Sequence, residues 1–171
     1  MEVVFMGSGT SMGVPTVGCG CAVCVSDNPK NKRTRPSLLL KAKSRHLLID
    51  TATDLRAQAI RESVQRIDAV LYTHSHADHI LGLDDLRPFN FHQKMHIPCF
   101  GNEPTIRNIC DTFKYVFTDP QPGGSIPRII PNVIDGPFEF DGIAIQPLPV
   151  LHGQLPIYGY RIGGLSYITD C

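Results

Sequence analysis

The stretch that decides the fold reads YTHSHADHILGL and covers residues 72–83. It gathers four metal-competent side chains within six residues, directly after the apolar run AVLYT: His74, His76, Asp78 and His79. Because His74 and His76 are two apart, an extended backbone points both rings to the same side. Asp78 and His79 follow once the chain has turned, so they can face a second, nearby point. Imidazole together with carboxylate suits Zn²⁺, Mn²⁺ or Fe²⁺, whereas Ca²⁺ prefers more oxygen ligands.

A histidine-rich surface turn is the alternative interpretation of this stretch. It is disfavoured because apolar segments lie on both sides, AVLYT before and ILGL after, which places the turn at the end of a sheet. Two metal ions about 3.5–4 Å apart can hold both the entering and the leaving oxygen of a displacement. The stretch therefore predicts a hydrolytic metal centre at a strand end.

The bulk composition is that of an ordinary globular chain. Of the 171 residues, 42% are hydrophobic and 19% are charged, and sixteen basic residues balance sixteen acidic ones. No strong global field therefore draws nucleic acid or membrane to the chain. No apolar run approaches the roughly 20 residues of a membrane span, and the N-terminal MEVVFMGSGT has neither a basic leader nor a cleavage site. We expect a cytoplasmic protein.

Hydrophobic periodicity predicts an α/β domain in which helices separate the early strands and the later half is mostly strand. We expect a single domain, residues 1–171, built as a sandwich of sheets rather than as a doubly wound parallel sheet. The expected strands are 2–6, 38–42, 45–50, 69–73, 97–101, 128–134, 138–140, 143–150, 157–162 and 165–169, and the expected helices are 51–63 and 103–117. Hairpin turns are expected at Lys43–Ser44, Asp141–Gly142 and Gly163–Gly164.

The glycine-rich segment GSGTSMG after the first strand invites a nucleotide-binding interpretation. Its glycines at positions 7, 9 and 13 do not fit G-x-G-x-x-G, and no Lys-Ser or Lys-Thr pair follows as in a P-loop. The segment therefore predicts a tight turn at which the backbone passes close to another part of the chain.

Three of the six cysteines stand close together in GCGCAVC: Cys19, Cys21 and Cys24. In a reducing compartment such spacing points to a metal or to catalysis rather than to disulfides. Three thiolates within six residues can surround one tetrahedral Zn²⁺ that takes its fourth ligand from elsewhere. Free cysteines in a loop are the alternative, and buried apolar filler is the expectation for isolated cysteines such as Cys99.

The spacing of the three histidines and the aspartate in THSHADH resembles the H-x-H-x-D-H signature of the metallo-β-lactamase superfamily, whose members are mostly binuclear metallohydrolases. The resemblance implies an αββα sandwich of two mixed sheets flanked by helices. It also implies two further ligands, His152 in PVLHG and Asp170 in YITD. One ion then takes His74, His76 and His152, and the other takes Asp78, His79 and the shared Asp170.

The N-terminal third narrows the resemblance. GSGTSMGVPTVGCGCAVC followed by RTRPSLLL is similar to the PhnP-type branch, the phosphoribosyl cyclic phosphodiesterases. In that branch a G-C-x-C-x-x-C cluster binds a structural zinc away from the active site, with a histidine from the C-terminal part as the fourth ligand. The resemblance thus implies two divalent ions in the active site, Zn²⁺ or Mn²⁺, and one structural Zn²⁺ at the three cysteines.

The end of the chain bears on the second ion. The sequence stops at YITDC, directly after an expected strand, which leaves that edge of the sheet uncovered. In the superfamily a last histidine ligand of the second ion lies further downstream. We therefore expect the larger N-terminal part of a longer domain, with a fold incomplete at its C-terminus and an incomplete second metal site.

Several further residues are expected to support the site. Asp50, at the end of HLLID, matches a superfamily aspartate near the metal loop and would accept a hydrogen bond from a metal-bound group; a cap of the helix that follows is the competing interpretation. Arg87 in LDDLRPF would contact a phosphodiester in a bidentate manner, against a solvated helix face as the alternative. Gly82 is expected to allow close packing beneath the ions, and His92 and His96 are expected at the surface or substrate rim.

The residues lead to three functional hypotheses. The first is a metal-dependent phosphodiesterase, with Asp78 and His79 in catalytic roles, in which a metal-bound hydroxide hydrolyses a small cyclic phosphate of the phosphoribosyl 1,2-cyclic type. The second is a ribonuclease Z-like tRNA nuclease, and the third is a non-catalytic zinc-binding module. The expected partner is a small phosphodiester; a homodimer is compatible with the sequence, whereas a nucleic acid or membrane partner is not expected.

Overall fold

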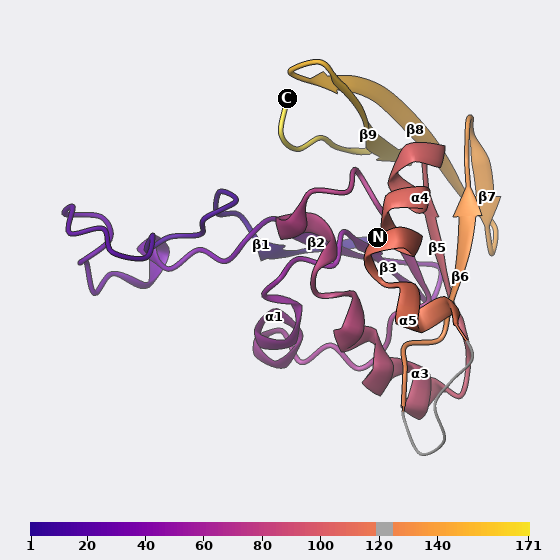
Figure 1. Cartoon of the computed structure of the whole chain (residues 1–171), viewed down its shortest axis with the longest axis horizontal. Coiled ribbons are helices and arrows are strands. Elements are labelled where there is room, and N and C mark those ends of the chain that lie inside the picture. The colour runs from indigo at the N-terminus through magenta and orange to yellow at the C-terminus, as the bar shows by residue number, and fades with distance from the viewer. Residues whose placement is uncertain (119–124) are drawn as a thin grey trace.

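The computed structural model describes residues 1–118 and 125–171, in which two β-sheets face each other (Figure 1). The first sheet has six strands within this part of the chain, and their spatial order equals their order in the sequence. They are β1 (Glu2–Gly7), β2 (Ser37–Ala42), β3 (Arg45–Ile49), β4 (Ala69–Leu71), β5 (Ile97–Gly101) and β6 (Ile129–Val133). The pairs β1–β2 and β2–β3 are antiparallel, whereas β3 to β6 run parallel.

The second sheet is antiparallel throughout the described residues. Its strands are β7 (Phe138–Phe140), β8 (Ile143–His152), β9 (Leu155–Ile162) and β10 (Leu165–Tyr167), in the spatial order β10-β9-β8-β7. The expected metallo-β-lactamase-like α/β fold is confirmed, but the expectation of two mixed sheets is wrong for this one. The hairpins explain why: short turns join each of its strands to the next, and a tight turn can only connect antiparallel neighbours.

The helices cover one face of the first sheet. They are α1 (Leu55–Arg61), α2 (Ala77–Ile80), α3 (Arg87–Gln93), α4 (Glu103–Thr112) and α5 (Lys114–Phe117), with short 3₁₀ turns η1 (Pro29–Asn31) and η2 (Leu83–Leu86). Within residues 1–118 and 125–171 no helix packs on the outer face of the second sheet, so the layers run α–β–β. The expected αββα sandwich, which the sequence predicts to be incomplete at its C-terminus, is thus present without its second helical layer in these residues. None of the helices in these residues has both the length and the apolar character needed to cross a bilayer.

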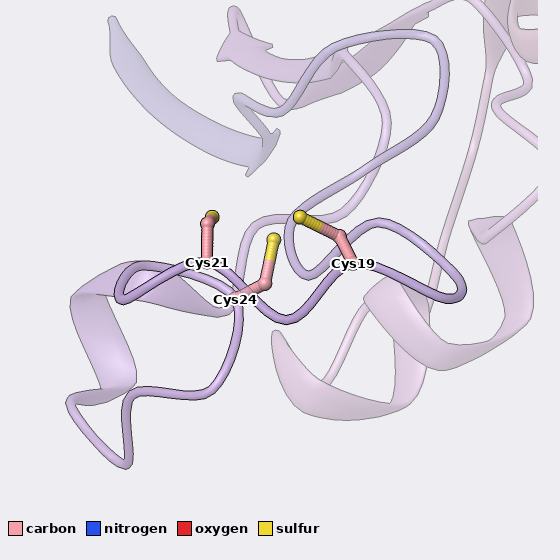
Figure 2. Close-up of side chains that lie close together, drawn as sticks. All are labelled: Cys19, Cys21 and Cys24. Carbon is pink, nitrogen blue, oxygen red and sulfur yellow. The ribbon is translucent and has the colours of Figure 1, made fainter.

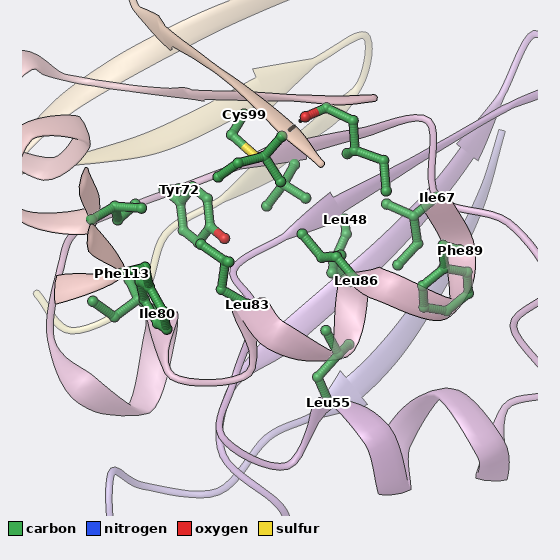
Figure 3. Close-up of a cluster of buried hydrophobic side chains, with 14 of the residues drawn as sticks. Leu48, Leu55, Ile67, Tyr72, Ile80, Leu83, Leu86, Phe89, Cys99 and Phe113 are labelled. Atoms are coloured by element: carbon green, nitrogen blue, oxygen red, sulfur yellow. Dashed lines mark hydrogen bonds between the residues drawn. The ribbon is translucent and has the colours of Figure 1, made fainter. Parts of the chain in front are cut away.

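The central strands carry apolar side chains on both faces. Leu39 and Leu48 pack with the helices, in the cluster shown in Figure 3, while Leu38 and Leu47 point to the other side and pack against the second sheet. All four are at most 1% exposed. A fully buried leucine contributes about 1.5–3 kcal/mol, and burial on both faces explains why these strands read as continuous apolar runs.

The expected strands occur with bounds that differ by one or two residues at some ends, and the two expected helices are shorter or divided. The helix expected at 51–63 begins only at Leu55, directly after Asp54, and the hydroxyls of Thr51 and Thr53 donate to the carbonyls of Ile80 and Ala77. Helix 103–117 is divided at Phe113 into α4 and α5. The hairpin turns occur as expected, with left-handed backbone at Lys43, Ser44 and Asp141.

A long arm, residues 8–36, projects from the sheet between β1 and β2 (Figure 1). Its base is closed by backbone contacts: the Gly9 N–H donates to the Thr34 carbonyl at 2.7 Å, and Val14 and Arg33 form an isolated bridge. A Cβ on Gly9 would lie 2.6 Å from the Arg33 oxygen. The glycine segment is therefore the close backbone approach that the sequence predicts.

The close approach beneath the metal loop gives a first prediction. A Cβ on Gly82 would overlap the carbonyl oxygen of Ala52 and lie 2.9 Å from the Leu55 Cβ, and neither neighbour is free to retreat. We expect Gly82→Ala to lower the free energy of unfolding by about 1–3 kcal/mol, because this is the usual cost of adding atoms to a well-packed core. Chemical denaturation would measure it.

The matched control is Gly136→Ala, since a Cβ there has no neighbour within 4 Å among the described residues. It should change stability by less than about 0.5 kcal/mol. Equal stability of the two variants would contradict the packing argument.

Candidate metal centre

The candidate site lies where two adjacent parallel strands end. In the register of β3 and β4, Ile49 lies opposite Leu71, so the residues that follow both strands meet at one sheet edge. Asp50 comes directly after β3, and the metal loop begins after β4. The loop then turns into α2, whose N-cap residue is His76, and this turn carries Asp78 and His79 back toward Asp50.

Three histidines form the first ligand group. The Nε2 atom of His74 lies 3.1 Å from the Nδ1 atom of His76. His152, the last residue of β8, places its ring centroid 5.2 Å from that of His76 and 5.7 Å from that of His74. One nitrogen from each ring lies within 4.8 Å of the others. The second sheet thus delivers the distant histidine to the metal loop.

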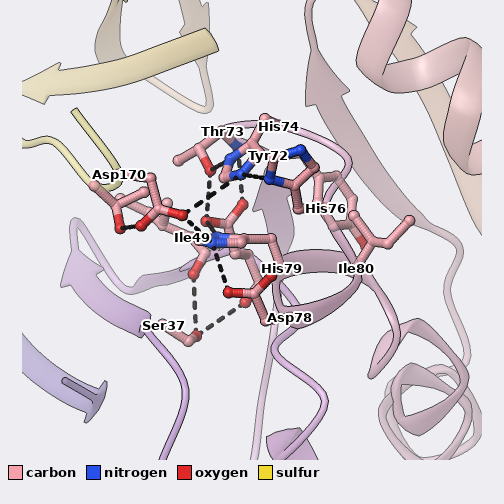
Figure 4. Close-up of polar contacts among 12 residues, drawn as sticks. Ser37, Ile49, Tyr72, Thr73, His74, His76, Asp78, His79, Ile80 and Asp170 are labelled. Atoms are coloured by element: carbon pink, nitrogen blue, oxygen red, sulfur yellow. Dashed lines mark hydrogen bonds and ion pairs between the residues drawn. The ribbon is translucent and has the colours of Figure 1, made fainter. Parts of the chain in front are cut away.

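A second group forms on the inner side of the same cluster (Figure 4). The Nε2 atom of His79 lies 3.2 Å from the Oδ2 atom of Asp170 and 3.3 Å from the Oδ2 atom of Asp78, and His74 Nε2 lies 3.7 Å from Asp170 Oδ2. The Oδ2 atom of Asp78 is buried and accepts no hydrogen bond within the described residues. An unpartnered buried carboxylate oxygen facing an imidazole fits a divalent cation.

Asp50 forms hydrogen bonds with Thr73 and His79 on the buried side of the site. Its Oδ1 atom accepts a hydrogen bond from the Thr73 N–H at 2.8 Å. Its Oδ2 atom lies 2.7 Å from the Thr73 hydroxyl and 2.8 Å from His79 Nδ1. The competing interpretation of Asp50 as a helix cap is wrong, because α1 begins five residues later behind Asp54. The contact with His79 is instead the kind of outer hydrogen bond that orients a ligand.

Burial divides the site into an inner and an outer side. Asp50, His74 and His79 are at most 1% exposed, whereas His76 is exposed and His152 is partly exposed. The inner groups are therefore fixed by the core, and the outer imidazoles face the solvent. A ligand held between the two sides would be reachable from outside.

The two inner histidines have opposite pKa shifts. Burial disfavours a charged His79 ring, but the carboxylates of Asp50, Asp78 and Asp170 outweigh burial and raise the pKa of His79 to about 9. Burial, aided by repulsion from His79, lowers the pKa of His74 to about 4. Without a bound metal ion, His79 is therefore the positively charged ring at neutral pH and His74 the neutral one.

The three cysteines of the arm come together as the sequence predicts (Figure 2). The sulfur atoms of Cys19, Cys21 and Cys24 lie within 4.8 Å of one another. A backbone hydrogen bond from Cys24 and contacts with the other two thiols lower the pKa of Cys21 to about 7. Three convergent thiols, one of them readily ionised, are a donor set that suits Zn²⁺. Cys99 is buried in the core, as expected of a filler.

Arg87 lies outside the cluster of histidines and aspartates. Its guanidinium pairs with Asp84 and donates to the Ser125 carbonyl. Together with His92 it lines a hollow of about 980 Å³ between α1 and α3, whose lining includes none of the proposed metal ligands. The substrate role of Arg87 stays a prediction, and the observed contacts do not support it.

Thr73 is the site residue that the sequence did not indicate. Its hydroxyl lies 2.7 Å from Asp50 Oδ2 and 3.0 Å from His74 Nδ1, so that it stands between the two. A threonine at the end of an apolar strand reads as an ordinary strand former. Only the register of β3 and β4 shows that its side chain meets a carboxylate.

Comparisons with known proteins agree with this geometry. The family model described as "Beta-lactamase superfamily domain" matches residues 45–171. A solved diphosphatase of the PhnP family shares 43% identity and a TM-score of 0.87, covering 96% of this chain and 62% of its own. A Porphyromonas gingivalis protein described as an octanoyltransferase is 41% identical over 99% of this chain and 35% of its own. A Bradyrhizobium diazoefficiens ribonuclease Z is 37% identical over 60 residues, which are 34% of this chain and 20% of its own.

The likeness to the solved diphosphatase confirms the resemblance to the PhnP-type branch. This chain spans less than two thirds of that protein and about a third of the Porphyromonas gingivalis relative. The shared part contains every residue of the two ligand groups, since residues 45–171 include all of them.

After metal is removed with EDTA, the opposite pKa shifts of His74 and His79 predict that the free energy of unfolding is largest near pH 6.5, the ordinary pKa of histidine. Between about pH 4 and 6.5 the unfolded chain holds a proton that folded His74 does not, so stability rises with pH. Between 6.5 and about 9 folded His79 holds a proton that the unfolded chain has lost, so stability falls. Denaturation across this range measures the profile.

His79→Gln is the control for the alkaline side, because it removes the group that titrates there. It should flatten the fall above pH 6.5 and keep a shallower rise on the acid side, because His74 stays buried but loses the repulsion from His79. A wild-type profile that keeps rising to pH 9 would contradict the assignment.

The cysteine cluster predicts a zinc site that is independent of the histidines. Cys21→Ser should lose about one zinc ion per chain, because two thiolates hold Zn²⁺ far more weakly than three. Elemental analysis after dialysis measures the loss. Cys110→Ser, which changes a thiol outside the cluster, should keep the wild-type zinc content. Equal zinc in both variants would exclude the cysteine site.

Proposed function

Because the chain belongs to the beta-lactamase superfamily, we propose that it is a metal-dependent hydrolase of phosphoric diesters. The substrate class that we propose is a small cyclic phosphate of the phosphoribosyl 1,2-cyclic type. The 43% identity to a PhnP-family diphosphatase supports phosphorus as the reacting centre. The proposed partner is accordingly a small phosphodiester, and not a membrane.

One observation carries the proposal. The proposed ligands come from three separate places in the sequence and converge at one sheet edge, and His79 and Asp170 are 91 residues apart yet 3.2 Å from each other. Chance rarely brings histidines and carboxylates together at such separation, since burying them unpaired is costly. The site also stays open on one side, at His76 and His152.

The donors fit two divalent ions, for which we propose Zn²⁺ or Mn²⁺. His74, His76 and His152 would hold one, and Asp78, His79 and Asp170 would hold the other, with Asp170 shared between them. When bound, such ions polarise a phosphoryl oxygen and lower the pKa of water, which supplies the nucleophile at neutral pH.

The residues of the chain hold the proposed metal ligands in place. Asp50 and the core fix the inner rings, so the donors need little rearrangement when a substrate arrives. His76 and His152 on the open side would lie nearest to an incoming phosphodiester. A hydrogen bond from Asn108 to the Ser75 hydroxyl, at 2.9 Å, ties the exposed part of the metal loop to α4.

A ribonuclease Z-like tRNA nuclease is the second candidate, and two observations favour it. One is the ribonuclease Z similarity over 60 residues. The other is the projecting arm. Its residues Lys30, Lys32 and Arg33 form no ion pair among the described residues, so their charges are available to the phosphates of an RNA. A net charge of zero argues for the small substrate, because polyanion binding depends on many cationic contacts.

Hydrolysis of three substrates tests the proposal: a ribose 1,2-cyclic phosphate, bis-p-nitrophenyl phosphate and a precursor tRNA. We expect the cyclic phosphate to be cleaved fastest. His152→Ala should lose at least about 100-fold in rate together with bound metal, since even outer partners of a metal site are worth 10–100-fold. His92→Ala, in the separate hollow, is the control and should keep both.

Three outcomes would redirect the assignment. Preferred cleavage of the precursor tRNA would favour the second candidate. Full metal content without turnover of any of the three substrates would contradict an enzyme and favour a zinc-binding module. Loss of activity in His92→Ala alone would move the active site to the hollow beside α3.

A further inference from the structure

A buried chain of hydrogen bonds connects the two inner histidines through Asp50, which directly follows β3, and Thr73, which lies two residues beyond β4. Asp50 Oδ2 lies 2.8 Å from His79 Nδ1 and 2.7 Å from the Thr73 hydroxyl, and that hydroxyl lies 3.0 Å from His74 Nδ1. All four side chains are at most 1% exposed. With no solvent to supply alternative partners, the donors and acceptors must match along the chain.

The number of protons fixes the direction of each bond. An ionised carboxylate only accepts, so the single hydroxyl proton of Thr73 goes to Asp50. The Thr73 oxygen can then only accept from His74, which requires a proton on His74 Nδ1. A neutral imidazole has one ring proton, so His74 Nε2 keeps its lone pair. That atom is the one that faces His76 Nδ1 at 3.1 Å and Asp170 Oδ2 at 3.7 Å.

We propose that Thr73 is a positioning residue of the metal centre: its hydroxyl holds His74 as the Nδ1–H tautomer, with Nε2 free to bind a metal ion. The inference rests on the metal site of the proposed function and not on its substrate. Because Asp50 also accepts a hydrogen bond from Nδ1–H of His79, one carboxylate sets the ring orientation in both ligand groups. The two groups are thereby coupled through Thr73 and Asp50.

The position suits threonine for a physical reason. Thr73 lies two residues beyond the end of β4. Its β-branched side chain has few χ1 rotamers, and its N–H also donates to Asp50 at 2.8 Å. The hydroxyl is therefore held between carboxylate and imidazole with little freedom. Valine has the same shape without the hydroxyl. It would leave His74 Nδ1 and one acceptor site of Asp50 without a partner and would release His74 to take the other tautomer.

The test compares Thr73→Val with Thr73→Ser. In ¹⁵N-labelled, EDTA-treated protein, two-bond ¹H–¹⁵N spectra of the imidazoles report which nitrogen of His74 is protonated. We expect the Nδ1–H form in the wild type and in Thr73→Ser, and the Nε2–H form or a mixture in Thr73→Val. Competition with a chelator should show metal binding that is about 10–100-fold weaker in Thr73→Val, while Thr73→Ser stays close to the wild type.

Two results would overturn the inference: an Nε2–H tautomer of His74 in the wild type, or equal metal affinity in the two variants. Thermal unfolding shows whether Thr73→Val folds. If it does not, the tautomer of His74 in the wild-type spectrum is the measurement that supports or overturns the inference. A wild type with the expected tautomer and bound metal, but without hydrolysis of any phosphodiester, would refute the proposed function and leave the role of Thr73 standing.

Discussion

The buried carboxylate of Asp50 is the interaction on which the candidate site depends. A charge taken out of water costs several kcal/mol unless its hydrogen bonds are satisfied, and Asp50 receives three, two from Thr73 and one from His79. Its backbone is left-handed, with φ of 60°, which turns the chain off β3 and aims the side chain at the end of β4. A carboxylate held so firmly can define the position of a whole loop.

The same edge of the sheet owes its rigidity to packing on two faces. The strands before Asp50 and Thr73 are buried between the helices and the second sheet, and Gly82 lets the metal loop lie against the Ala52 carbonyl. Rigid support of this kind is what a metal site needs, because ligand positions must already be close to the required geometry before the ion arrives.

Interactions between residues close together in the sequence could be predicted from it, whereas those that depend on how distant segments pair could not. The cluster at residues 74–79 is local, so spacing alone revealed it, and the family resemblance added His152 and Asp170. The role of Thr73 depends on strand register, which the sequence does not show. Arg87 was assigned by proximity to the metal loop, but an ion pair with Asp84, three residues earlier, holds it elsewhere. The direction of strands in the second sheet depends on turns that hydrophobic periodicity does not specify.

The contacts that hold the second sheet in place also lie beside the candidate site. The Tyr160 hydroxyl donates to the Tyr72 carbonyl at 2.7 Å, and the Tyr158 N–H donates to the Thr73 carbonyl at 3.0 Å. Both bonds join β9 to the residues just before His74. The neighbouring strands carry His152 and lead to Asp170, so the contacts that seat this sheet also bring the distant ligands into place. A chain whose sheets separated would retain the metal loop and lose its partners, which makes metal affinity a direct measure of how well the two sheets are joined.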